Sequence, residues 1–305
     1  MCIRDRFAPR AQPGSARLGV WREDVVVELA GVAGLPAGMQ AFLEAGETAW
    51  SAARRVVESE RGKRWPVEGI LLRAPMERPP SVRDFYAFEQ HVKTAHAIRG
   101  RPVPAEWYSF PVFYFSNPGS VCGPEDSVSP PPGSRTLDYE LEVACVIGRG
   151  GRDIPADEAE NHIFGYCIMN DWSARDLQRA EMSVGLGPAK GKDFATSLGP
   201  WLVTPDELAD VADGRPGGYR LEMTARVNGA ERSRGNLADV HYSFGEMIAR
   251  ASAGVDLIAG EVIGSGTVGT GSLLEQTGGE GPWLEPGDVV ELEVERLGVL
   301  RNTVF

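Results

Sequence analysis

The sequence contains few cysteines and pairs none of them in a metal-binding or redox motif. Its four cysteines (Cys2, Cys122, Cys145 and Cys167) are scattered, and no C-x-x-C pair occurs. This pattern disfavours a thiolate zinc site and a disulfide framework. Cys145 and Cys167 stand in apolar stretches, which predicts buried free thiols. Such cysteine usage is typical of a reducing compartment, so we expect a cytoplasmic protein.

Long apolar runs and an excess of basic residues are also missing. No segment reaches the ~18 apolar residues of a membrane span, and no charged-then-apolar leader opens the chain. Lys and Arg total 31 against 43 Asp and Glu, which gives a formal net charge of −12. This charge argues against nucleic acid or an anionic membrane surface as the main partner. The 305 residues, 42% of them hydrophobic, are enough for a large globular core.

Three common catalytic or nucleotide-binding motifs are absent. The stretch G-R-G-G-R-D (148–153) follows a predicted strand, but Asp153 stands where a dinucleotide-binding loop needs its third glycine. No G-x-x-x-x-G-K-[ST] loop occurs, so phosphate binding of that type is not indicated. No G-x-S-x-G supports acyl transfer by a serine nucleophile. The chemistry has to come from other residues.

The most informative stretch that is present is R-T-L-D-Y-E-L-E-V-A-C-V-I-G, residues 135–148. Apolar residues alternate at period two from Tyr139 to Ile147, which predicts a strand. The other face carries three acids and then two apolar residues: Asp138, Glu140, Glu142, Ala144 and Val146. An acidic face that continues into apolar residues indicates a covered strand, so Glu140 and Glu142 would point into a cavity. Two acids roughly 6.5–7 Å apart on a strand can converge on one cation. An exposed edge strand with an acidic face is the alternative.

The remaining pattern predicts an α+β fold that is mainly β. Further strands are expected at 16–21, 24–29, 68–75, 110–115, 163–170, around 201, 219–227 and 289–298. Helices are expected at 36–59, 81–96, near 155–162, from 174 onward and at 243–251. Ser81 and Ser173 are candidate N-caps for two of these helices. Residues 1–6 fit their surroundings poorly and carry no structural weight. We predict a small N-terminal domain, residues 1–65, and a catalytic metal-binding domain, residues 66–305.

Four acids stand at the ends or edges of predicted elements, with no Cys or His clustered among them: Asp84, Glu140, Glu142 and Asp171. All-oxygen coordination suits Mg²⁺, Mn²⁺ or Ca²⁺ and disfavours zinc or copper. Each acid taken singly is more often a surface residue or a salt-bridge partner than a metal ligand, so the joint pattern carries the interpretation. On the predicted helix 81–96, Asp84 and His91 are seven residues apart and would share a face.

Several motifs resemble those of the fumarylacetoacetate hydrolase family. They are D-F-Y-x-x-x-x-H (84–91), L-D-Y-E-L-E (137–142), H-I-F-G-Y-C-I-M-N-D-W-S-A-R-D-L-Q (162–178), G-K-D-F-A-T (191–196), S-L-G-P-W (197–201), G-S-L-L-E (271–275) and L-G-V-L-R-N-T-V (297–304). The resemblance covers roughly residues 66–305. It implies a mixed β-sandwich roll with a small N-terminal α/β cap, a homodimer and a Mg²⁺-type ion. The implied reaction is cleavage or rearrangement of a small oxo acid.

The resemblance also assigns roles to individual residues, and the four acids above would be the metal ligands. His91 would be the general base that draws a proton from water, with Glu275 as its carboxylate partner. A histidine suits this task because its ordinary pKa of ~6.5 lets it accept a proton near neutral pH. The donors for negative charge on the attacked carbonyl oxygen would be Arg175, Gln178 and Lys192. The substrate contacts would be Tyr86, Tyr114 and Thr267.

Each of these residues has a plainer explanation as well. His91 alone fits a surface helix histidine, and Glu275 fits a solvated glutamate at a strand end. Arg175 fits a salt bridge with Asp171 or Asp176, which is compatible with a catalytic role. Gly191, beside Lys192, fits a loop whose backbone approaches the ligand closely.

The sequence departs from the family pattern after the histidine. Members that cleave fumarylacetoacetate carry a substrate-binding arginine soon after it, where this chain has Gly100 between Arg99 and Arg101. Smaller relatives carry a glutamate three residues after the histidine, where this chain has Thr94. The base and its partner are therefore of the hydrolase type, with Glu275 as the carboxylate.

These observations predict a Mg²⁺-dependent hydrolase that cleaves a carbon–carbon bond in a 1,3-diketo acid, such as fumarylacetoacetate or an acylpyruvate. Isomerisation, decarboxylation or dehydration of a 2-oxo acid at the same metal site is the alternative within the family. A metal-binding module without catalysis is the alternative from a different class.

Overall fold

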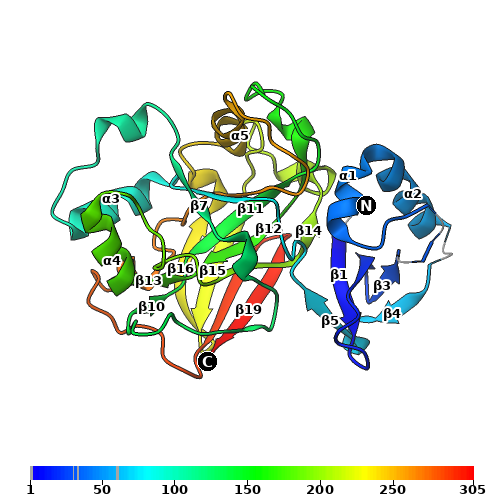
Figure 1. Ribbon diagram of the computed structural model, residues 1–305, viewed down its shortest axis with the longest axis horizontal. Helices are drawn as coiled ribbons and strands as arrows, with labels where there is room; N and C mark the ends of the chain where they lie inside the picture. The colour runs from blue at the N-terminus through cyan, green and yellow to red at the C-terminus, as the bar shows by residue number, and fades with distance from the viewer. Residues whose placement is uncertain (1–2, 30, 33, 60–61) are drawn as a thin grey trace.

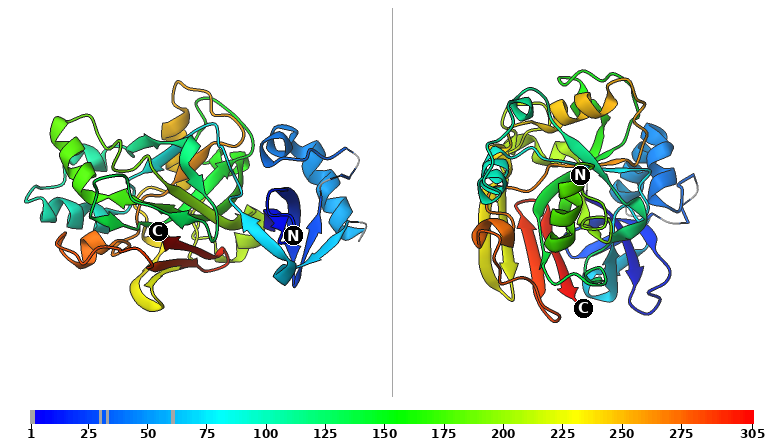
Figure 2. Two further views of the ribbon diagram at one scale, coloured as in Figure 1. Left: turned by 60° about the horizontal axis from the view of Figure 1, so that its bottom comes forward. Right: turned by 60° about the vertical axis from the view of Figure 1, so that its left-hand side comes forward.

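The computed structural model describes residues 3–29, 31–32, 34–59 and 62–305. The N-terminal strands and helices gather at one end of the long axis (Figure 1). Helices α3 (Glu89–Ile98) and α4 (Arg175–Val184) lie at the opposite end, and a second view shows the same separation (Figure 2). Two sheets fill the space between these ends.

A large mixed sheet crosses the whole molecule. In spatial order its strands are β4 (Arg64–Pro66), β3 (Val25–Glu28), β2 (Arg17–Arg22), β1 (Ile3–Pro9), β14 (Thr196–Val203), β12 (Ile163–Asp171), β11 (Leu141–Ile147), β17 (Val262–Gly264), β6 (Val82–Phe85) and β7 (Phe113–Ser116). Two further strands join it at the side, β5 (Ile70–Arg73) on β1 and β8 (Val121–Cys122) on β14. Most neighbours are antiparallel, whereas β17 and β6 run parallel.

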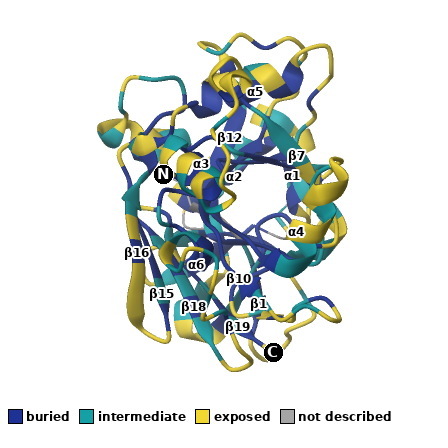
Figure 3. Cartoon of the chain, turned by 90° about the vertical axis from the view of Figure 1, so that its left-hand side faces the viewer, coloured by how far each residue is buried: buried dark blue, intermediate teal, exposed yellow. Residues whose placement is uncertain are grey.

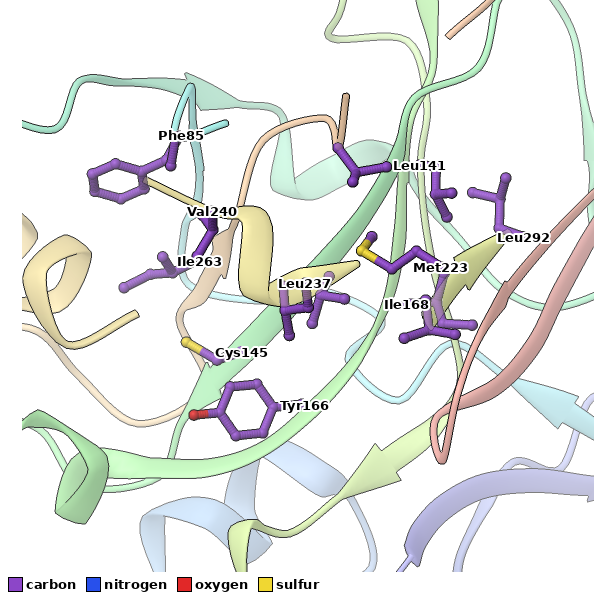
Figure 4. Packing of buried hydrophobic residues seen from close by; sticks show 14 of the residues in the cluster. Phe85, Leu141, Cys145, Tyr166, Ile168, Met223, Leu237, Val240, Ile263 and Leu292 are labelled. Carbon is purple, nitrogen blue, oxygen red and sulfur yellow. The ribbon is translucent and has the colours of Figure 1, made fainter. Parts of the chain in front are cut away.

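A second sheet packs against the middle of the first. Its strands are β16 (Ala230–Asn236), β15 (Glu222–Val227), β18 (Val289–Val294), β19 (Gly298–Val304) and β9 (Ser127–Val128). Strands β12 and β14 contact β18 and β19, and a core of apolar side chains fills the interface. Figure 4 shows part of it, with Ile168 of the large sheet close to Met223 and Leu292 of the second sheet. The α+β, mainly β sandwich that the sequence predicted is confirmed.

Strand β11 has the alternation expected of the 135–148 stretch. Val143 and Cys145 face the core between the sheets, whereas Ala144 and Val146 face a second core beneath the N-terminal helices. Both faces are covered, and every residue of β11 is buried. The alternative of an exposed acidic edge strand is wrong. The stretch is split, however, because β10 (Leu137–Asp138) leaves the large sheet to pair with β13 (Ser173–Ala174).

The helices are short, and the two N-terminal ones pack against one face of the large sheet. Besides α3 and α4 they are α1 (Met39–Glu44), α2 (Gly46–Glu58), α5 (Phe244–Ser252) and α6 (Leu273–Gln276). Short 3₁₀ helices are η1 (Val67–Gly69), η2 (Ala105–Tyr108), η3 (Pro118–Ser120), η4 (Ala159–His162), η5 (Pro205–Val211) and η6 (Leu237–Asp239). Helix α5 matches the predicted 243–251 segment, and Ser243 forms a capping box with Glu246 at its start.

Two predicted helices have a different structure. The segment 36–59 forms α1 and α2 rather than one helix, because Gly46 adopts a left-handed φ of 61° at the break. The segment 81–96 is not one helix with Ser81 as its N-cap. Its first part is strand β6, which is fully buried between β17 and β7, and α3 begins only at Glu89. Asp84 therefore does not share a helix with His91.

Three smaller expectations were also wrong. The helix near 155–162 is reduced to the turn η4. Ser173 lies in β13, and the N–H of Asp176 in α4 is bound instead by the Thr136 hydroxyl, at 2.7 Å. Residues 3–6 belong to β1, which pairs with β2 and β14. The predicted division at 65/66 stays a prediction.

Two predictions about burial are settled by the fold. Cys145 and Cys167 are buried free thiols, as expected, while Cys2 lies outside the described residues. No helix in the described part of the chain is both long and apolar enough to cross a membrane.

A phenylalanine of the large sheet packs against aromatic side chains of both N-terminal helices. Phe164 of β12 is 3% exposed, and its ring centroid lies 5.1 Å from that of Trp50 in α2 and 6.1 Å from that of Phe42 in α1. We expect Phe164→Ala to lower the free energy of unfolding by about 3–5 kcal/mol, because it leaves a cavity between the helices and the sheet. Denaturant titration measures this loss. The matched control Phe305→Ala, at an 80% exposed site, should change stability by less than about 0.5 kcal/mol; an equal effect of both substitutions would contradict the prediction.

Candidate active site

Four carboxylates meet at the end of the large sheet near α3 and α4. One oxygen from each lies within 4.8 Å of the others, and the residues are Asp84, Glu140, Glu142 and Asp171. None is more than 5% exposed. The structure thus brings together all four acids that the sequence singled out. Figure 3 shows this end of the molecule, where exposed helices surround buried strands.

The register of the sheet explains why these acids meet. Asp84 of β6 lies opposite Gly264 of β17, which is the neighbour of β11. A Cβ on Gly264 would lie 2.5 Å from Asp84 Oδ1, so a glycine leaves room for the carboxylate. In the link between β10 and β11, the Glu140 N–H donates to the Asn170 side-chain oxygen at 2.9 Å. That bond fixes the link beside the end of β12, where Asp171 lies.

Two buried cations oppose this negative charge. Lys192 Nζ donates to Glu140 at 2.6 Å and to Asp171 at 2.5 Å. Arg175 Nη2 lies 2.8 Å from both Asp138 and Glu140, and its Nε donates to Asp138 at 2.9 Å. The salt bridges of Arg175 with Asp171 or Asp176 that the sequence suggested are not formed. Five carboxylates surround these two cations, which leaves three formal negative charges.

The direction in which each pKa is shifted indicates which acids have no cationic side chain close enough to compensate their charge. Burial and the charge of Asp171 raise the pKa of Asp84 well above its ordinary value. Burial and the charge of Asp84 do the same to the pKa of Glu142. Burial also raises the pKa of Asp171, although Lys192 opposes this rise. For Glu140 burial is outweighed, because Lys192 and Arg175 together hold its pKa below the ordinary range.

The carboxylate oxygens that have no hydrogen-bond partner are suitable ligands for a divalent cation. Asp84 Oδ1, Glu142 Oε2 and Asp171 Oδ1 are buried and make no hydrogen bond within the described part of the chain. Buried carboxylate oxygens without partners are costly unless a cation compensates them. All the candidate ligands are oxygens, which is the donor set of Mg²⁺, Mn²⁺ or Ca²⁺. The residues present therefore fit the ion that the sequence predicted.

A histidine and a glutamate lie in contact beside this group. His91 Nδ1, in α3, lies 2.8 Å from Glu275 Oε2, in α6, although the two groups are not aligned as a hydrogen bond. Both side chains are at most 5% exposed. Glu275 is held by the N–H of Thr270 and the hydroxyl of Ser272, each at 3.1 Å. The two predicted partners are thus adjacent, and neither is a solvated surface residue.

Asp138 is a site residue that the sequence did not assign. Its carboxylate accepts the N–H groups of Leu273 and Leu274, at 2.8 and 3.0 Å, as well as the contacts from Arg175. It therefore holds the start of α6, which carries Glu275, and Arg175 at the same time. Its position beside Glu140 and Glu142 on the acidic face was the only sequence signal for it.

Glu181 was missed in the same way. This residue of α4 accepts the backbone N–H groups of Ala189, Lys190 and Gly191 at 2.6–3.1 Å, so it holds the loop that precedes Lys192. A Cβ on Gly191 would lie 2.6 Å from the Gln178 N. The glycine is thus needed for the close approach of this loop to α4, and close approach to a ligand, as the sequence suggested, stays a prediction.

Two of the acids, the histidine and both cations line one cavity of about 250 Å³, namely Asp84, Glu140, His91, Arg175 and Lys192. The predicted substrate contacts Tyr86, Tyr114 and Thr267 line it as well. Tyr114 donates to Asp171 at 2.6 Å, and Thr267 donates to Glu142 at 3.3 Å. The Tyr86 hydroxyl is buried without a partner. Burial raises the pKa of Tyr86 to about 12, so the hydroxyl remains a donor at neutral pH. Gln178 accepts a hydrogen bond from Arg175 at 3.1 Å, as their spacing on α4 predicted.

Comparison with known proteins agrees with this geometry. The family model described as fumarylacetoacetate (FAA) hydrolase C-terminal matches residues 81–305. The chain belongs to the fumarylacetoacetate hydrolase family. It is 35% identical to the human protein named oxaloacetate tautomerase FAHD2A, mitochondrial, over 88% of this chain and 80% of that protein. It is 34% identical to a Sphingomonas protein named 2,4-didehydro-3-deoxy-L-rhamnonate hydrolase, over 68% of this chain and 69% of that protein.

A solved structure of the family has the same fold. The fumarylacetoacetate hydrolase from Exiguobacterium antarcticum superposes with a TM-score of 0.77 at 28% identity, over 100% of this chain and 99% of that chain. Members of the family are enzymes that act on small molecules, and their names include a tautomerase as well as hydrolases. Family membership therefore establishes the fold and the class of site, and leaves the reaction to be argued from the residues.

The uncompensated negative charge predicts that Glu142→Gln stabilises the protein without metal and weakens its stabilisation by added metal. Glu142→Gln removes a carboxylate whose pKa is raised by burial and by Asp84. Ionising such a group destabilises the fold as pH rises above the ordinary glutamate value of 4.5. We therefore expect metal-stripped Glu142→Gln to be more stable than wild type at neutral pH, by about 1–2 kcal/mol.

Added Mg²⁺ should then separate the two proteins. Wild type should gain about 2.7 kcal/mol at a hundredfold excess over Kd, whereas Glu142→Gln should gain little. Thermal unfolding with and without Mg²⁺ measures both effects. The control Glu285→Gln alters an exposed acid and should behave as wild type. A full Mg²⁺ response in Glu142→Gln would contradict the assignment of this ligand.

Proposed function

We propose that the protein is a Mg²⁺-dependent hydrolase that cleaves a carbon–carbon bond in a 1,3-diketo acid, such as an acylpyruvate or fumarylacetoacetate. The observation that carries this proposal is the contact of Glu275 with His91, which lines the same cavity as Asp84 and Glu140 of the carboxylate group. A base with a carboxylate partner, next to a cation site and away from bulk water, is suited to activating one bound water. The homodimer and the cytoplasmic location stay predictions.

The four carboxylates would hold the ion: Asp84, Glu140, Glu142 and Asp171. When bound, a divalent cation supplies a Lewis acid for the oxygens at the oxo-acid end of the substrate. Mn²⁺ or Ca²⁺ would suit the same oxygens. Tyr86 offers its unpartnered hydroxyl as a further donor to this end of the substrate.

His91 performs the proton transfer in this proposal. Its imidazole takes a proton from water, and Glu275 stabilises the imidazolium that results. The hydroxide oxygen bonds to the carbonyl carbon, whose oxygen gains the negative charge. When that charge collapses, the carbon–carbon bond breaks, and its electron pair moves to the carbon of the departing oxo acid. This carbon then takes up a proton, which completes the two acid products.

Lys192 and Arg175 each have a donor left for the oxyanion. An ammonium group has three N–H donors, and Lys192 uses two of them on Glu140 and Asp171. A guanidinium has five, of which Arg175 uses one on Nε for Asp138 and one on Nη1 for Gln178. Its Nη2 makes ion-pair contacts with Asp138 and Glu140 without an aligned hydrogen bond. Burial disfavours both cations, but the neighbouring carboxylates outweigh it and raise the pKa of each. Both therefore stay charged while the oxyanion forms.

Tautomerisation of a 2-oxo acid is the second candidate. The relative with 35% identity over 88% of the chain is named an oxaloacetate tautomerase, which favours it. In that reaction His91 would move a proton between carbon and oxygen, and neither water nor bond cleavage is needed. The same acids and donors would stabilise the enolic form, so the cation site alone does not separate the two reactions.

The base assignment predicts a loss of rate without a loss of ion. With Mg²⁺ and an acylpyruvate, His91→Ala should lower kcat by about 10²–10⁴-fold, because the proton acceptor is removed. Its thermal stabilisation by Mg²⁺ should equal that of wild type, since His91 is not a ligand. Decay of the diketo absorbance, with quantification of both acid products, measures the rate. Unchanged turnover in His91→Ala would refute the assignment.

The same assay separates hydrolysis from tautomerisation. Hydrolysis yields one pyruvate for each acylpyruvate consumed, and in H₂¹⁸O the other acid gains one labelled oxygen from the attacking water. Tautomerisation of oxaloacetate changes the enol absorbance and yields no second product. Absorbance change on oxaloacetate, with no cleavage of any diketo acid, would replace the hydrolase proposal by the tautomerase.

A further inference from the structure

A short link between β6 and α3 joins the carboxylate group to the base. Asp84 is the third residue of β6 and His91 is the third residue of α3, and only residues 86–88 separate the two elements. These three residues belong to neither a helix nor a strand. The conformation of this link therefore decides where His91 lies relative to the carboxylates.

Three hydrogen bonds from other parts of the chain hold the link. The Tyr86 N–H donates to the Val112 carbonyl at 3.1 Å, and the His241 N–H donates to the Ala87 carbonyl at 2.9 Å. The third bond comes from a side chain, because Nε1 of Trp107, in η2, donates to the Tyr86 carbonyl at 2.7 Å. Tyr86 is thus held on both sides of its backbone.

Tyr86 connects the Trp107 bond with His91. The Tyr86 ring packs against the imidazole in a T-shaped arrangement, with the ring centroids 5.4 Å apart and an interplanar angle of 89°. Both Tyr86 and His91 line the cavity, whereas Trp107 lies outside it. Trp107 can therefore act on the reaction through Tyr86, and not through contact with a substrate.

The Trp107 side chain is fixed by contacts of its own. It is 4% exposed, and its carbonyl accepts a hydrogen bond from the Tyr242 hydroxyl at 2.7 Å. Its ring centroid lies 5.0 Å from that of His241 and 5.7 Å from that of Tyr242. A hydrogen bond is directional, so an N–H on an immobilised ring limits the positions open to the Tyr86 carbonyl.

We propose that Trp107 is a positioning residue for the base: its indole N–H fixes the Tyr86 carbonyl and thereby places the Tyr86 ring and His91 beside the carboxylate group. The inference rests on the proposed function in giving His91 the proton transfer, a step that hydrolysis and tautomerisation share. Proton transfer requires the acceptor within hydrogen-bond reach of the proton, so a small displacement of His91 lowers the rate. The hydrogen bonds of the Trp107 indole and carbonyl go to Tyr86 and Tyr242, so the ion should be held as before.

Removal of the indole N–H tests this role. Trp107→Phe keeps an aromatic ring at the site and loses the donor. With Mg²⁺ and the substrate that wild type turns over, an acylpyruvate or oxaloacetate, kcat should fall about tenfold. The rise in unfolding temperature on addition of Mg²⁺ should equal that of wild type. The matched control Trp65→Phe removes an indole N–H that donates to Glu28 at 2.7 Å in the N-terminal part of the sheet, and it should leave kcat unchanged.

The NMR signal of the His91 imidazole reports directly on the position of the base. In ¹H–¹⁵N spectra of Mg²⁺-loaded protein this signal is assigned from its loss in His91→Ala. It should shift in Trp107→Phe and keep its wild-type position in Trp65→Phe. A role of Trp107 in stability alone would not move it.

Tyr242→Phe provides a second test if Trp107→Phe does not fold. This substitution removes only the hydroxyl that donates to the Trp107 carbonyl, so the indole is retained but is less tightly held. We expect kcat to fall about two- to threefold, with a shift of the His91 signal.

The outcomes separate this inference from the proposed function. An unchanged kcat in these variants, or a lower kcat with an unshifted His91 signal, would overturn the positioning role and leave the proposed function intact. If wild type turns over neither a diketo acid nor oxaloacetate, the proposed function fails and the inference fails with it. A lower kcat with a shifted His91 signal and a full Mg²⁺ response, neither change appearing in Trp65→Phe, supports it.

Discussion

Compensation of negative charge in a buried space is the constraint on which the rest of the structure depends. Five carboxylates and two cationic side chains lie within the core, where an unpaired charge is far more costly than in water. Neither set is stable there without the other. The acids come from the sheet and the link between β10 and β11, whereas Arg175 and Lys192 come from α4 and the loop after it. The packing of α4 on the sheet is therefore coupled to the chemistry, and the residual negative charge is what gives the site its affinity for a divalent ion.

Asp138 extends this coupling from the ion site to the base. One fully buried carboxylate orients Arg175 and also binds the first N–H groups of α6, the helix that carries Glu275. Arg175 and the helix that carries the partner of His91 are thus anchored to the same carboxylate. Glu181 does the equivalent for the loop of Lys192. Neither of these two acids need touch a substrate, and each acts through the residue that it positions.

The sequence predicted the chemistry of the site better than the elements that carry it. Period-two alternation correctly placed Glu140 and Glu142 on a buried face, because alternation is a local property of a strand. Asp84 was placed on a helix, since nothing local shows that Val82–Phe85 pairs with β17, some 180 residues further along the chain. Strand formation there is decided by that distant partner. Asp138 and Glu181 were missed for a related reason: an acid that binds backbone N–H groups has no characteristic spacing, so only the folded chain identifies its partners.

The corrected position of Asp84 has a consequence for how one fold serves several reactions. Asp84 is fixed in the sheet between β17 and β7, whereas His91 lies on α3, beyond a short link, and contacts Glu275 of α6. The carboxylate group and His91 are therefore carried by different elements. Changes in α3, α6 or the segments after them can alter His91 and its contact with Glu275 without disturbing the carboxylates. Relatives with a shared fold that are named a tautomerase and hydrolases are what such a separation permits. In this interpretation, α3 and α6 determine which reaction takes place, and the large sheet supplies the carboxylates that the different reactions share.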